Sequence, residues 1–285
     1  MRKIIKTALA LFLLTQLWAC DKENDTSQKE YVPKFIVEGW IENGQYPHVI
    51  LSHNVPFFSS LDSAQLSELI IRFAKITVSD GVKTEVLTTT LDDNYFPSFI
   101  YRGYDLKGES GKTYTLKIEY AGNTITSTTR IPEAVPLDSL WFSKREKDKM
   151  QLIVQIKDKA MEKNYYRLYT KIRSNKVFIP ILLSNLDDRF FSGQEILLQV
   201  NRGSDNNLTV KNEPYFERGD TVLVKFSNIP KEGFDFWNSI QDEVLNSINP
   251  LVGSTGSIKS NITGPAAGIW CGYGSTIHKV IAKEE

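Results

Sequence analysis

From residue 34 onward, apolar and polar residues alternate in short runs, and turn-forming dipeptides separate these runs. Such alternation buries one face of a β-strand, because successive side chains of a strand point to opposite faces. The pattern therefore predicts a mainly β protein, with hairpin turns at Asp80-Gly81 and Ala121-Gly122. The expected early strands are 35–41, 48–53, 74–79, 82–91, 94–102, 113–120 and 124–130.

The domain organisation follows from the spacing of these strands. Short strands at roughly ten-residue intervals are typical of an immunoglobulin-like β-sandwich, which we expect over residues 34–131. Two prolines favour extended backbone and predict a linker at 132–137. A second β-rich domain is expected over 138–285. Its expected strands are 140–143, 151–157, 165–173, 177–183, 195–200 and 221–226.

One segment near 232–249 has helical periodicity, because its apolar residues recur at three- and four-residue steps. Asn249-Pro250 is expected to end this helix. An amphipathic helix in a β domain most simply covers an open face or edge of the sheet, and docking of a partner is the alternative. The apolar residues of the pattern are Trp237, Ile240, Val244, Leu245 and Ile248.

The first residues have the features of a lipoprotein export signal. Basic residues precede an apolar run at 7–17, which is too short to cross a bilayer core of about 30 Å. Leu17 and Ala19 precede Cys20 in an order that resembles a lipobox. We therefore expect residues 1–19 to be a signal peptide and Cys20 to carry the lipid. An ordinary secretory signal with an incidental cysteine is the alternative.

The charge balance depends on this signal. The whole sequence has 34 Lys+Arg and 34 Asp+Glu, whereas residues 1–19 contain three basic residues and no acidic one. The mature chain would be slightly acidic, without the basic excess of a nucleic-acid binder. Residues 20–33 are largely polar and are expected to form a lipidated, solvated tether. The acidic residues after Cys20 resemble the surface-export signal of Bacteroidota lipoproteins, which implies an outer-membrane anchor facing the cell exterior. The alternative is the enterobacterial rule, under which an Asp directly after the lipidated cysteine means retention in the inner membrane.

A search for catalytic chemistry gives no constellation. His48 and His53 are five residues apart, so on one strand they face opposite sides and do not share a metal. Cys271 has an apolar sequence setting, which favours a buried structural cysteine over a nucleophile. We therefore expect a protein that is not an enzyme and uses no cofactor or metal. The acidic segments 92–94 and 187–188 would suit calcium, but hairpin turns use the same residue types.

Aromatic residues are crowded into the first expected domain, and most are expected in the sandwich core. The exceptions adjoin prolines in predicted turns. Aromatic side chains on loops stack on sugars or anchor protein interfaces. The candidate ligand or partner contacts are therefore Phe57, Phe58, Tyr95 and Phe96.

Five stretches occur in a particular order along nearly the whole mature chain. They are Phe35-Ile36-Val37-Glu38-Gly39-Trp40-Ile41, Ile76-Thr77-Val78-Ser79-Asp80-Gly81, the link at 131–140, Asn164-Tyr165-Tyr166-Arg167-Leu168, and the tail from 249 to 273. Together they resemble a Bacteroidota lipoprotein family known as domain of unknown function 4249. The resemblance implies two β domains. It transfers no catalytic residue.

The resemblance also implies a functional setting, because members of the family are often encoded near TonB-dependent outer-membrane transporters. We therefore expect an outer-membrane, surface-exposed lipoprotein that is a non-enzymatic binding or accessory partner of a TonB-dependent nutrient transporter. Its membrane contact would be the N-terminal lipid, and no nucleic acid would be involved. The alternative is a structural or adhesion lipoprotein with no small-molecule ligand.

Overall fold

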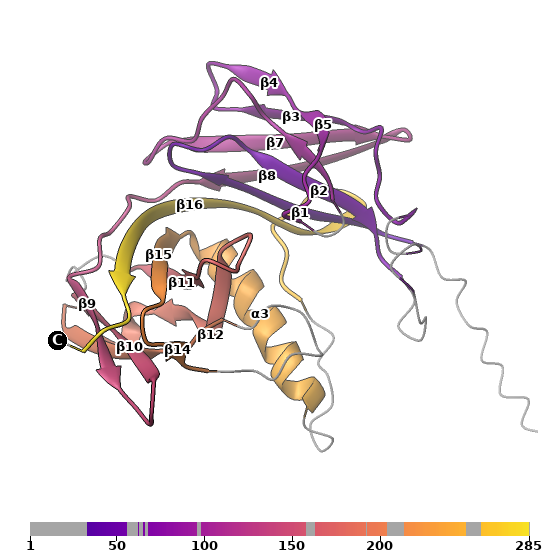
Figure 1. Ribbon diagram of the computed structural model, residues 1–285. Helices are drawn as coiled ribbons and strands as arrows, with labels where there is room; N and C mark the ends of the chain where they lie inside the picture. The colour runs from indigo at the N-terminus through magenta and orange to yellow at the C-terminus, as the bar shows by residue number, and fades with distance from the viewer. Residues whose placement is uncertain are drawn as a thin grey trace, which may run out of the picture. The chain divides into compact units, whose positions relative to one another are not determined.

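Three β-sheets and one long helix make up the described part of the computed structural model (Figure 1). The structure describes residues 33–55, 62, 65, 68–95, 98–157, 163–191, 193–203, 214–248 and 258–284. The mainly β fold that the alternation predicts is confirmed. The expected signal peptide, Cys20 and all of the tether except Pro33 lie outside the described residues.

The N-terminal part is a two-sheet sandwich whose core is closed by apolar side chains from both sheets. The second sheet has the order β4-β3-β7-β8, and it packs against the β1 and β2 strands of the largest sheet. Val37 and Leu51 from one sheet meet Ile76 and Leu116 from the other, and all four are fully buried. The strands are β1 (Phe35–Glu42), β2 (His48–His53), β3 (Lys75–Ser79), β4 (Thr84–Val86), β5 (Thr88–Leu91), β6 (Phe99–Arg102), β7 (Thr113–Tyr120) and β8 (Asn123–Arg130).

The largest sheet has eight strands in the order β12-β11-β15-β16-β1-β2-β6-β5. It therefore contains strands from both sides of the 132–137 segment, and the described chain from Pro33 onward forms one compact unit. The strands of its second half are β11 (Tyr165–Lys171), β12 (Ile179–Asp187), β15 (Thr221–Ile229) and β16 (Ala266–Ile281).

Strand β16 joins the two halves and is not among the expected strands. Residues 266–273 pair in parallel with β1, and residues 274–281 pair antiparallel with β15. Glycines make this path possible, because the segment after β8 crosses the strand closely. A Cβ on Gly272 would lie 2.3 Å from the carbonyl oxygen of Arg130, and one on Gly274 would lie 2.1 Å from that of Pro132. Because glycine has no side chain, these residues interrupt the alternation of apolar and polar residues from which a strand would be predicted.

A third sheet and the helix cover opposite faces of the second half of the large sheet. The third sheet contains β9 (Ser139–Lys144), β10 (Lys149–Lys157), β13 (Glu195–Val200) and β14 (Phe216–Glu217), and it shares an apolar core with β11 and β15. A 3-10 turn, Asp188–Phe190, follows β12.

Helix α3 (Lys231–Ile248) matches the expected helix closely and lies on the other face of the sheet (Figure 1). Its Phe236 packs with Ile229 of β15 and Cys271 of β16. None of the described helices is both long and apolar enough to span a membrane.

Candidate functional site

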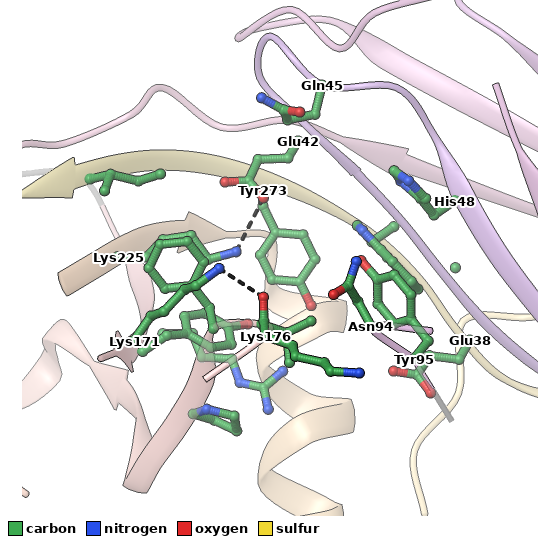
Figure 2. A pocket seen from close by; sticks show the side chains of 18 of the residues that line it. Glu38, Glu42, Gln45, His48, Asn94, Tyr95, Lys171, Lys176, Lys225 and Tyr273 are labelled. Carbon is green, nitrogen blue, oxygen red and sulfur yellow. Dashed lines mark hydrogen bonds and ion pairs between the residues drawn. The ribbon is translucent and has the colours of Figure 1, made fainter. Parts of the chain in front are cut away.

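A cavity of about 630 Å³ opens on the face of the eight-stranded sheet that points away from the sandwich core (Figure 2). Alternation along β1 creates this arrangement. Val37, Gly39 and Ile41 are buried toward the sandwich, whereas Glu38, Trp40 and Glu42 line the cavity. Strands β2, β11, β12, β15 and β16, helix α3, the β1–β2 turn and the loops before β6 and β12 contribute the remaining walls. The volume lies within the range of small-molecule binding sites.

Arg167 of β11 is the most enclosed charged side chain that lines the cavity, with only 7% of its surface exposed. Its guanidinium carbon lies 3.7 Å from the ring centre of Trp237 on α3 and 5.1 Å from that of Tyr169. Its Nε donates to Ser184 Oγ of β12 over 3.4 Å. Within the described chain, Arg167 forms no ion pair with a carboxylate. Three elements therefore hold a guanidinium whose charge is not neutralised by direct contact.

Glu38 lines the same cavity, where protein surrounds most of the carboxylate although the side chain stays in contact with solvent. The surrounding protein desolvates the carboxylate and raises the pKa of Glu38, and the positive charge of Arg167 acts in the opposite direction. Glu38 and Arg167 thus influence each other electrostatically without forming an ion pair.

Lys225 of β15 contrasts with Arg167, because a carboxylate neutralises it directly. Its Nζ lies 3.2 Å from Glu42 Oε2, and both side chains are largely buried (Figure 2). The ammonium group also lies 4.7 Å from the ring centre of Tyr169 and 5.1 Å from that of Phe178. This pair is a closed ionic contact in the cavity wall.

Two further lysines are held by backbone carbonyls. Lys171 Nζ donates to the carbonyl oxygen of Lys176 over 2.7 Å (Figure 2). Lys176 Nζ in turn donates to the carbonyl oxygen of Asp93 over 3.3 Å. The second bond connects the loop before β12 with the loop before β6. Neither lysine forms an ion pair within the described residues, so both add positive potential to the cavity.

Aromatic side chains give the cavity its apolar surface. Trp40 stacks on His48 with 5.1 Å between ring centres, and Tyr95 lies 5.5 Å from Trp40. Trp237 Nε1 donates to the Tyr273 hydroxyl over 2.9 Å. The aromatic lining among the described residues consists of Trp40, Tyr95, Tyr169, Phe178, Trp237 and Tyr273.

His48 is uncharged at neutral pH in this setting. Burial, helped by the positive charge of Arg102, lowers the pKa of His48 to about 4. The ring therefore supports Trp40 as a neutral stacking partner. The other histidine of β2, His53, does not line the cavity.

The structure places only one of the expected contact residues in this cavity. Tyr95 lines it, whereas Phe57, Phe58 and Phe96 lie outside the described residues. Arg167 and Glu38 were not among the expected site residues. The sequence does contain a signal for these two residues. Each is a charged residue between apolar or aromatic neighbours in a predicted strand, so its charge is expected on one face of the sheet.

The other candidate groups have structural surroundings. Cys271 is fully buried, and burial raises the pKa of its thiol to about 12. Asp92 accepts hydrogen bonds from the backbone and side-chain nitrogens of Asn94, and Asp187 forms an ion pair with Arg189. In the part of the chain that the structure describes, no group of three or more His, Cys, Asp or Glu residues is arranged to hold a metal ion.

Comparison with known proteins places the chain in a family. No curated protein matches the sequence significantly. A family model described as Domain of unknown function (DUF4249) matches residues 22–275. The match includes strands of all three sheets and the strands that line the cavity, and it stops within β16. The chain therefore belongs to the DUF4249 family.

Proposed function

We propose that the protein is a surface-exposed outer-membrane lipoprotein that binds a small ligand in this cavity. In this role it acts as a non-enzymatic accessory partner of a TonB-dependent nutrient transporter. The observation that carries the proposal is the cavity itself, which combines aromatic walls with the enclosed, unpaired guanidinium of Arg167.

The lining has the composition of a ligand site. Such sites are mostly apolar and aromatic, with a few placed polar groups that orient the ligand. Here Trp40, Tyr95 and Tyr273 supply flat surfaces, and Arg167 and Glu38 supply groups of opposite charge. Desolvation disfavours a largely buried guanidinium that has no carboxylate partner, and a carboxylate on a ligand would supply that partner.

The chemistry of the potential nucleophile favours binding over covalent catalysis. The thiol of Cys271 lies beneath α3, where a Cβ on Gly233 would lie 2.5 Å from its Sγ. With a pKa of about 12, this thiol is protonated at neutral pH. A cysteine in this state contributes packing and not nucleophilic attack.

The anchor and the transporter are supported by the sequence. The lipobox-like residues before Cys20 and the acidic residues after it support a lipid anchor at the cell surface. The family resemblance supports a transporter partner. A structural or adhesion lipoprotein without a ligand is the competing proposal.

The accessory role is tested in the source bacterium with a full-length chain tagged at its C-terminus. We expect the tagged protein to recover a TonB-dependent transporter, and protease added to intact cells to digest it. Cys20→Ala is the matched control, because it removes the lipid attachment site and should release the protein from the membrane fraction. Recovery of no transporter, or protection from protease, would contradict the role.

A further inference from the structure

We propose that the cavity takes a small ring compound bearing a carboxylate, and that Arg167 anchors the carboxylate while the aromatic walls hold the ring. This inference rests on the proposed ligand-binding function and specifies the chemical class of the ligand.

The first argument is the position of Arg167. A residue that is 93% buried and still lines the cavity is fixed by its surroundings before a ligand arrives. Trp237 of α3 stacks on the guanidinium, and Ser184 of β12 accepts a hydrogen bond from its Nε. A group held in this way loses little side-chain entropy on binding, which favours affinity.

The second argument is that the terminal nitrogens of Arg167 remain available to a ligand. The bond to Ser184 uses Nε, and the two terminal nitrogens of Arg167 make no hydrogen bond to the described residues. Two terminal N–H groups present parallel donors, which match the two oxygens of a carboxylate. The side of the guanidinium that carries these two nitrogens therefore suits a planar anion.

The third argument is the charge balance of the cavity. Glu42 is already paired with Lys225, whereas Arg167, Lys171 and Lys176 have no carboxylate partner in the described chain. Glu38 and Asp92, which also line the cavity, offset two of these three positive charges. A single negative charge on the ligand balances the remaining positive charge, whereas a doubly charged phosphate would exceed it.

The fourth argument is the ring. Aromatic side chains come from several elements around the cavity, including Trp40 on β1, Tyr95 in the loop before β6 and Tyr273 on β16. Aromatic faces stack on both aromatic rings and the apolar faces of sugar rings. The shared chemistry is therefore a ring acid, whose source is either an aromatic acid or a sugar acid.

The test uses the full-length chain, purified in detergent, and four probes measured by ligand-detected NMR. Phenylacetate is compared with phenylacetamide, and glucuronate with glucose. We expect the acid of one pair to bind at least about tenfold more tightly than its neutral partner. The pair that binds identifies whether the ring is aromatic or a sugar.

Variants then assign the effect to Arg167. Arg167→Gln should reduce the affinity for the acid about tenfold or more and leave the neutral partner unchanged, and Arg167→Lys should restore only part of the loss. Arg218→Gln, at an exposed site outside the cavity, should leave both affinities unchanged.

A second variant keeps the inference falsifiable if Arg167→Gln fails to fold. Glu38→Gln removes the carboxylate that interacts electrostatically with Arg167, and the substitution is made at a solvent-accessible position. It should raise the affinity for the acid about threefold and leave the neutral probe unchanged.

The outcomes separate the inference from the function on which it rests. Equal binding of acid and neutral probes would overturn the carboxylate anchor and leave the ligand-binding function standing. Binding of none of the four probes would overturn the ring acid as the ligand class, whereas the accessory function is contradicted separately if the tagged protein recovers no transporter.

Discussion

The two faces of strand β1 differ in what they do for the molecule. Val37 and Ile41 on one face are fully buried in the sandwich core, whereas Glu38, Trp40 and Glu42 on the other face line the cavity. Strand β16 continues the division, because Trp270 enters the sandwich core while Tyr273 faces the cavity. Alternate residues of the same strands therefore pack in the sandwich core on one side and line the cavity on the other.

Two tryptophans on these opposite faces give the largest expected difference. Trp270 is fully buried, and its Nε1 donates to the carbonyl oxygen of Tyr114 over 3.0 Å. Trp270→Ala should lower the free energy of unfolding by about 3–5 kcal/mol. Trp40→Ala, on the half-buried cavity side, should cost clearly less. Urea denaturation of both variants measures the difference, and equal losses would show that the two faces are not divided in this way.

Acidification tests the histidine that supports the cavity wall. The pKa of His48 is about 4 in the folded protein, against 6.5 for an unperturbed histidine. The unfolded chain therefore binds the proton more readily, so stability is fully present above pH 6.5 and is lost as the pH falls toward 4. From this group alone the loss is at most about 3 kcal/mol.

His48→Phe isolates this contribution, because it keeps a ring against Trp40 and removes the titration. Urea unfolding at pH 7 and pH 4 should show a smaller loss of stability in the variant than in the unmodified protein. An equal loss in both proteins would mean that folding does not lower the pKa of His48.

Glu38 gives the smallest expected effect on stability, with the opposite dependence on pH. A carboxyl group whose pKa is raised on folding destabilises the protein as the pH rises through its unfolded value near 4.5 and beyond. Glu38→Gln should therefore raise the unfolding midpoint slightly at pH 7 and leave it unchanged at strongly acidic pH. A lower midpoint at pH 7 would show that the ionised Glu38 stabilises the fold through Arg167.

Local patterns predicted much of this fold. The expected strands at 48–53, 113–120 and 195–200 have the same bounds as β2, β7 and β13, and the helix differs by one residue at each end. These segments carry their signal in neighbouring residues. Strand β16 does not, because its glycines are required by Arg130 and Pro132, whose closeness arises only in the folded chain.

The candidate site was less predictable for the same reason. Tyr95 was selected because it adjoins a turn, and it does line the cavity. Arg167 acquires its environment from Ser184 on β12 and Trp237 on α3, which lie far from it in sequence. Alternation in 165–169 placed Arg167 on one face of a strand, but it contained no information on what would cover that face.

The most direct test of this division of labour is a structure of the full-length chain with whichever of the four probes binds most tightly. We predict that the ring lies in the cavity between Trp40, Tyr95 and Tyr273, with the carboxylate on the terminal nitrogens of Arg167. The sandwich core around Trp270 should be unchanged. A carboxylate bound away from Arg167, or a probe bound outside the cavity, would contradict the account.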